Sequence, residues 1–133
     1  MTKVELQTLV QYWLTTSDSD WKAYLSLRRS RQYAQALFFL HLVIEKRIKA
    51  LIVKETRDHA PFSHALPFLI GKVAAIPSEQ MLGDLLVITG FNISGRYPDE
   101  KLEFYSNATK AFADEWHRRG KEILAWLDEK LSQ

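Results

Sequence analysis

The stretch that decides the fold is residues 34–52, AQALFFLHLVIEKRIKALI. At 100° per residue this helix has two apolar sides. One stripe holds Ala34, Leu37, Phe38, His41, Glu45, Ile48 and Ile52, and the opposite side holds Ala36, Phe39, Leu40 and Val43. A helix that is apolar on two sides must be covered on two sides. We expect one side to face the domain's own bundle and the other to need a second layer or a second chain.

Two groups that can carry charge, His41 and Glu45, lie one turn apart inside the apolar stripe. A buried carboxylate must find a partner or stay protonated. Arg96, ahead of the last predicted helix, is the expected ion-pair partner of Glu45. The pair is either structural or one wall of a ligand cleft, in which Arg96 holds a phosphate and Tyr97 stacks beside it. His41 is expected to be a hydrogen-bonded core histidine.

The composition is that of one domain spanning residues 1–133. Its 18 Lys and Arg against 16 Asp and Glu give a net charge of +2, which is too balanced to indicate nucleic-acid binding by itself. Basic clusters such as Arg28, Arg29 and Arg31 are expected to be solvated helix faces or ends, and the alternative is a track that binds the phosphates of a nucleic acid. The absence of cysteine excludes a disulfide framework and a thiol nucleophile. No stretch is apolar enough to span a membrane, and we expect a cytoplasmic protein.

The periodicity predicts an all-α fold, an up-and-down bundle of four to five helices. The first helix covers about 4–29, because the apolar phase continues through the polar segment TTSDSD at 15–20. The second covers about 31–55. A third starts after Ser63 and covers about 64–75, and a short fourth runs from a cap at Ser78 to about 90. The last long helix covers about 101–131, with His117 opposite its apolar stripe and expected in solvent.

Three marked places occur in order along the chain. They are Glu45-Lys46-x-x-Lys49-Ala50, then His64 with Leu66 and Leu69, and then Arg96-Tyr97-Pro98-Asp99. Together with YWL at 12–14, Asp20-Trp21-x-Ala23 and the closing ILAWL at 123–127, they resemble the HEPN family of small helical domains. The resemblance covers nearly the whole chain and rests on the joint order of pieces that are individually unspecific. It implies a helical bundle that commonly pairs as a homodimer.

Many members of that family are ribonucleases, whose signature is an Arg followed, after four to six residues, by a His. The His acts as general acid and base, and the Arg holds the phosphate. Arg96 stands at the family's Arg position, but the positions where the His would follow hold Lys101, Leu102 and Glu103. Arg57 and His64 have the right spacing, but they flank the loop before the third helix.

The resemblance therefore implies a HEPN domain without catalytic residues, acting as a binding or accessory module. Such small members frequently accompany a minimal nucleotidyltransferase in a two-component, toxin–antitoxin-like system, and the cleft would accept a nucleotide or another anion. Its expected residues are His41, Glu45, Lys49, Arg96 and Tyr97. The alternative is a metal-independent ribonuclease toxin with an altered site around Arg96, in which Lys101 or His64 replaces the missing imidazole. A third interpretation is a purely structural bundle.

No cofactor is expected, since the chain has no Walker loop, Gly-x-Gly-x-x-Gly or His-Glu-x-x-His. No metal site is expected either. His59 and His64 are five residues apart with no third ligand nearby, and no Glu-x-x-His occurs that would indicate a di-iron bundle.

Overall fold

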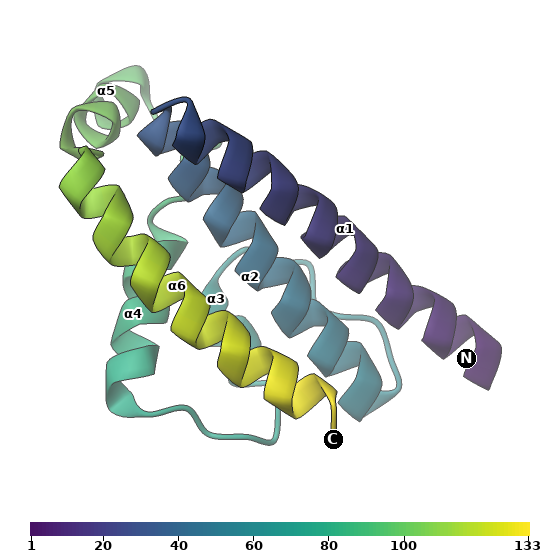
Figure 1. Cartoon of the computed structure of the whole chain (residues 1–133). Coiled ribbons are helices and arrows are strands. Elements are labelled where there is room, and N and C mark those ends of the chain that lie inside the picture. The colour runs from purple at the N-terminus through teal and green to yellow at the C-terminus, as the bar shows by residue number, and fades with distance from the viewer.

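A computed structural model describes residues 1–133 as six helices and no strands (Figure 1). The all-helical bundle predicted from the sequence is confirmed. The helices are α1 (Lys3–Arg29), α2 (Tyr33–Thr56), α3 (Leu66–Ile70), α4 (Glu79–Thr89), α5 (Pro98–Asn107) and α6 (Lys110–Leu131). None of them has the length and apolar character that crossing a membrane requires.

The second helix is the centre of the bundle. α2 contacts each of the other five helices, and the core side chains along it, from Leu37 to Val53, are almost fully buried. Figure 1 shows α1 and α6 running alongside α2, with α3 and α4 farther from the viewer, behind α6. The second apolar side of residues 34–52 is therefore covered by a second layer of the same chain.

α1 is one unbroken helix, as the continuous apolar phase predicts. It begins with a capping box, in which the Thr2 hydroxyl accepts from the Glu5 amide at 3.0 Å and the Glu5 carboxylate accepts from the Thr2 amide at 3.1 Å. Ser17, in the polar middle, is fully buried because it faces α2. Its hydroxyl donates to the Val43 carbonyl at 2.9 Å and accepts from Arg47 Nε at 3.1 Å.

The two shorter helices of the middle of the chain differ in how well their starts were predicted. α3 is shorter than expected, since it covers only Leu66–Ile70 and Gly71 is its C-cap. The Ser63 hydroxyl accepts from the Ala65 amide, which makes a turn before the helix rather than a cap of it. Ser78 caps α4 as predicted, because its hydroxyl accepts from the Met81 amide at 3.1 Å.

The predicted last helix over 101–131 is wrong, because the chain breaks between α5 and α6 at Ala108 and Thr109. Thr109 has an extended backbone, and its hydroxyl accepts from the Phe112 amide at 3.2 Å as the N-cap of α6. Phe91 shows the reason for the break. Its ring centre lies 5.8 Å from that of Phe104 and 5.9 Å from that of Phe112. In one straight helix these two residues would be about 12 Å apart along the axis, too far to close on one ring.

His117 is partly buried between α1 and α6, which corrects the expectation that it faces solvent. The Tyr24 hydroxyl lies 2.7 Å from His117 Nδ1, and the imidazole stacks on the Trp21 ring at 6.0 Å between centres. Burial lowers the pKa of His117, so the neutral imidazole accepts the hydrogen bond from Tyr24.

Candidate functional site

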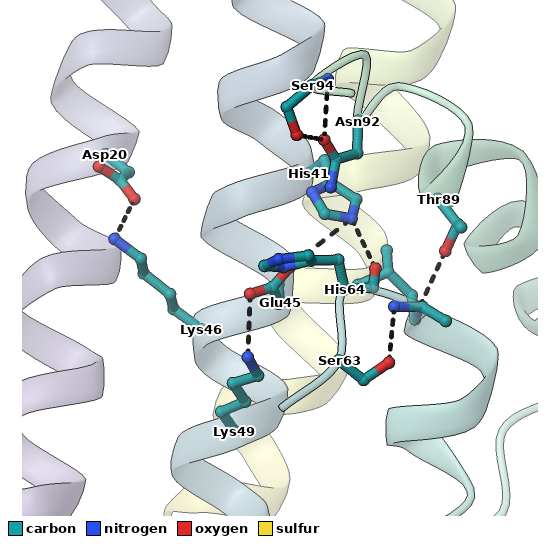
Figure 2. Close-up of polar contacts among 12 residues, drawn as sticks. Asp20, His41, Glu45, Lys46, Lys49, Ser63, His64, Thr89, Asn92 and Ser94 are labelled. Carbon is teal, nitrogen blue, oxygen red and sulfur yellow. Dashed lines mark hydrogen bonds and ion pairs between the residues drawn. The ribbon is translucent and has the colours of Figure 1, made fainter. Parts of the chain in front are cut away.

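The Glu45 carboxylate lies in the middle of α2 with three basic side chains around it (Figure 2). Lys49 Nζ donates to Glu45 Oε2 at 3.1 Å, and His64 Nδ1 donates to Oε1 at 2.9 Å. His41 Nε2 is 3.8 Å from Oε1. We call these four residues, His41, Glu45, Lys49 and His64, the Glu45 cluster. The side chains of Glu45 and Lys49 are only 5% and 7% exposed, so their ion pair is withdrawn from water.

His41 ties the loop before α3 to α2. Its Nε2–H donates to the main-chain carbonyl of His64 at 2.9 Å, and its Nδ1 is buried without a partner in the protein. Burial lowers the pKa of His41 below the ordinary value of 6.5, so the imidazole is neutral. His41 is therefore the hydrogen-bonded core histidine that the sequence predicts.

The loop that carries His64 is held on its other side by α4. The Leu66 amide, two residues after His64, donates to the Thr89 hydroxyl at 2.8 Å (Figure 2). The loop backbone is therefore bound from α2 at His64 and from α4 at Leu66, while the His64 imidazole is 66% exposed. Because Nδ1 faces the Glu45 carboxylate, Nε2 is the ring atom left to accept or donate a proton from outside.

Such a carboxylate–imidazole pair can orient a general acid or base. Cleavage of a phosphodiester also needs a cation free to hold the phosphate, and Lys49 is buried against Glu45 with its Nζ 5.3 Å from the centre of the Trp13 ring. No group of three or more His, Cys, Asp or Glu side chains is arranged to hold a metal ion. The Glu45 cluster is first of all a buried ion pair that carries one exposed imidazole.

The predicted ion pair between Glu45 and Arg96 is wrong. Arg96 donates from its guanidinium to the Gly90 carbonyl at 2.6 Å, at the end of α4. There it satisfies a carbonyl that the helix leaves unpaired and matches the negative end of the helix dipole. Tyr97, the N-cap residue of α5, is 74% exposed. The structure thus brings His41, Glu45 and Lys49 together and places Arg96 and Tyr97 elsewhere.

The sequence interpretation missed His64 as a partner of Glu45, although it marked His64 for the family resemblance and for its spacing from Arg57. Arg57 and His64 lie at different sites in the structure. Arg57 ends α2 in a left-handed conformation with φ of 59° and lines a groove with Lys3 and Leu6 of α1. A spacing along the chain therefore does not identify a shared site here.

A comparison with protein families matches the HEPN domain to residues 10–130. The chain belongs to the HEPN family. Among solved structures, the crystal structure of TT1696 from Thermus thermophilus is similar, with a TM-score of 0.76 and 21% identity over 91% of this chain and 97% of that one. At this identity the likeness shows the fold alone. No curated protein matches the chain.

In this HEPN domain the connection that holds Arg96 leads into α5, whose first turn carries Asp99 and Glu100. Carboxylates in a first turn occupy the positive end of the helix dipole. Lys101, Leu102 and Glu103 follow at the positions where the family's ribonuclease signature would require a histidine.

Proposed function

We propose that this HEPN domain is a binding or accessory module without ribonuclease activity. The observation that carries the proposal is the start of α5, where Lys101, Leu102 and Glu103 stand in place of an imidazole. Arg96 already donates to the Gly90 carbonyl, and Asp99 and Glu100 in the first turn repel a phosphate. These three features oppose RNA cleavage for independent reasons.

We further propose that the module works as a homodimer and partners a minimal nucleotidyltransferase in a two-component system. Exposed apolar side chains on the second layer support an interaction surface, among them Leu86 and Val87 on α4 and Leu102 and Tyr105 on α5. The buried side chains of residues 36–44 do not contribute, because the chain covers them itself. The ligand class that we propose is a nucleotide or another anion.

The main test is incubation of the purified protein with single-stranded RNA, with Arg96→Ala and His64→Gln tested beside it. We expect the same background with all three proteins. Cleavage by the wild type that disappears in either variant would overturn the non-catalytic assignment, because a contaminating nuclease would remain in every preparation.

The partner and the dimer have their own tests. Light scattering should give twice the 15.5 kDa mass of one chain at micromolar concentration, and a monomer there would contradict the homodimer. A tagged domain should retain a nucleotidyltransferase encoded beside it after co-expression. Leu86→Glu on the outer face of α4 should weaken one of these two associations without unfolding the exposed position.

The second candidate, a ribonuclease with an altered site, is favoured by one observation. His64 presents an exposed imidazole whose Nδ1 is bound to a buried carboxylate at 2.9 Å. That arrangement suits a general base. It is the second candidate because the cation beside it, Lys49, is buried and paired. The loss of cleavage in His64→Gln decides in its favour.

A further inference from the structure

A pocket of about 380 Å³ opens where α1 ends and both α2 and α6 begin. Figure 1 shows these three helix ends at the same end of the bundle as α5. Seven residues line the pocket: Leu25, Arg28, Arg29, Arg31, Tyr33, Lys110 and Asp114. None of them belongs to the Glu45 cluster.

The lining is strongly cationic, with four basic side chains against the single carboxylate of Asp114. Asp114 bridges two of them, since its oxygens lie 2.9 Å from Arg28 and 2.6 Å from Lys110 Nζ. These bonds lower the pKa of Asp114, so it stays ionised and holds both cations in place. The pocket keeps a net charge of +3 after this neutralisation, because four positive charges face one negative charge.

Much of the donor capacity in the pocket is unused. A guanidinium has five N–H donors, and Arg28 uses one of them on Asp114, while its Nε is buried without an acceptor. Arg28 and Lys110 both pair with Asp114. Arg29 and Arg31, by contrast, are exposed and form no ion pair in the structure. The exposed guanidinium groups of Arg29 and Arg31 can therefore bind oxyanions bidentately without first breaking an internal bond.

Two helix N-termini add to this field. Tyr33 is the first residue of α2, and Gln32 before it makes no side-chain cap. Lys110 is the first residue of α6. Neither helix has an acidic residue in its first turn. The positive end of the α2 dipole is therefore left without a cap or a carboxylate, whereas the start of α6 is capped by the Thr109 hydroxyl and has Asp114 one turn further on.

We propose that this pocket binds a small molecule that carries two or more adjacent phosphate groups. The guanidinium groups of Arg28, Arg29 and Arg31 together offer more N–H donors than one phosphate group can accept, which favours a ligand with several phosphates, and the volume suits a small ligand. Tyr33 provides an aromatic wall beside the cations. The inference deepens the anion-binding part of the proposed function and does not depend on the partner or on the absence of nuclease activity.

The test is calorimetric titration of the full chain with inorganic tripolyphosphate. Arg29→Gln/Arg31→Gln removes the two exposed cations that have no internal partner, and it should weaken binding by about tenfold or more. The matched control is Lys3→Gln/Lys72→Gln, which removes the same charge. Lys3 lies 25 positions before Arg28 in α1, so it is about 38 Å away, several screening lengths from the pocket. The control should change the affinity by less than about twofold.

Thermal unfolding of both variants should match the wild type, since all four positions are exposed. ATP as a second ligand identifies the source of the phosphates. Equal affinity assigns the site to a phosphate chain alone, and tighter binding of ATP assigns it to a nucleoside polyphosphate; both support the proposal.

Three results would overturn the proposal that this pocket binds a ligand with adjacent phosphate groups. They are no tripolyphosphate binding at about millimolar concentration, the weakest affinity of interest; an equal loss in the control variant; and binding of single-stranded RNA through Arg29 and Arg31 without any tripolyphosphate binding. None of these results bears on RNA cleavage, oligomeric mass or nucleotidyltransferase retention, so failure here and failure of the proposed function are distinguishable.

Discussion

Neutralising Glu45 should destabilise the domain far more than the same change on the surface. In Glu45→Gln the amide can still accept from His64, but the Lys49 ammonium, 7% exposed, loses the charge that compensates it. Breaking a buried ion pair from one side costs about 3–5 kcal/mol. Because the amide keeps part of the hydrogen bonding, we expect a loss of about 3 kcal/mol in the free energy of unfolding, at the lower end of that range.

The corresponding shift in melting temperature follows from the chain length. For 133 residues the unfolding entropy is about 0.28 kcal/mol/K, so a loss of about 3 kcal/mol lowers the melting temperature by about 11 °C. Urea unfolding followed by far-UV circular dichroism measures the free energy directly. Both experiments should be run at several protein concentrations, because dimerisation would make the apparent stability depend on concentration.

Two further variants make this prediction refutable. Glu45→Gln/Lys49→Met removes the stranded cation and fills its place with an apolar chain of similar length, so it should regain most of the lost stability. Glu122→Gln is the matched surface control, since Glu122 pairs with Arg118 but is 57% exposed, and it should cost less than about 1 kcal/mol. The reasoning fails if Glu45→Gln is no worse than Glu122→Gln, or if the double variant is no more stable than Glu45→Gln.

Three other outcomes follow from the packing and the titrating groups. Gly120→Val should lower the free energy of unfolding by about 1–3 kcal/mol, because a Cβ at Gly120 would lie 3.0 Å from both Leu40 methyl groups; an unchanged urea midpoint would contradict the tight contact. Thr109→Ala should cost about 1 kcal/mol by removing the cap of α6, measured in the same assay, and a gain in stability would indicate that α5 and α6 prefer to join. Burial lowers the pKa of both His41 and His117, so their contribution to stability is present above the ordinary pKa of 6.5 and is lost as the pH falls through the lower folded values. The urea midpoint should therefore decrease as the pH is lowered from about 7.5 to about 5. At pH 7.5, Tyr24→Phe should lower the free energy of unfolding by about 1 kcal/mol, because it removes the hydrogen bond to His117. A midpoint that rises on acidification would refute the assignment of neutral histidines.

The long-range partners of single side chains could not be predicted from the sequence as well as the helices could. The unbroken α1 was predictable, because helical phase survives a polar segment when a residue such as Ser17 faces the neighbouring helix. The same periodicity showed that Glu45 is buried. Lys49, four residues on in the same helix, is a partner that helical spacing does predict. The sequence could not choose between Arg96 and His64 as the distant partner, because that choice depends on where the loop before α3 lies in space.

The break between α5 and α6 could not be predicted from the sequence for a similar reason. Polar residues and a threonine near 106–109 permit a helix as well as a cap. The decision comes from Phe91, a residue of the preceding connection, around which Phe104 and Phe112 both close. On α5 the Phe104 ring therefore packs against Phe91, while the neighbouring Tyr105 is exposed.

The unequal burial of the two longest helices has a consequence for how the domain opens. α1 buries three residues over its 27, and only Leu6 of these lies before Ser17, whereas α2 buries fourteen of 24. The first half of α1 should therefore detach from α2 in partial unfolding that leaves the other helices in place, and its amide protons should exchange with deuterium before those of α2. Detachment of this half of α1 would expose the apolar side of α2 to a binding partner, and the packing of the other helices would be kept.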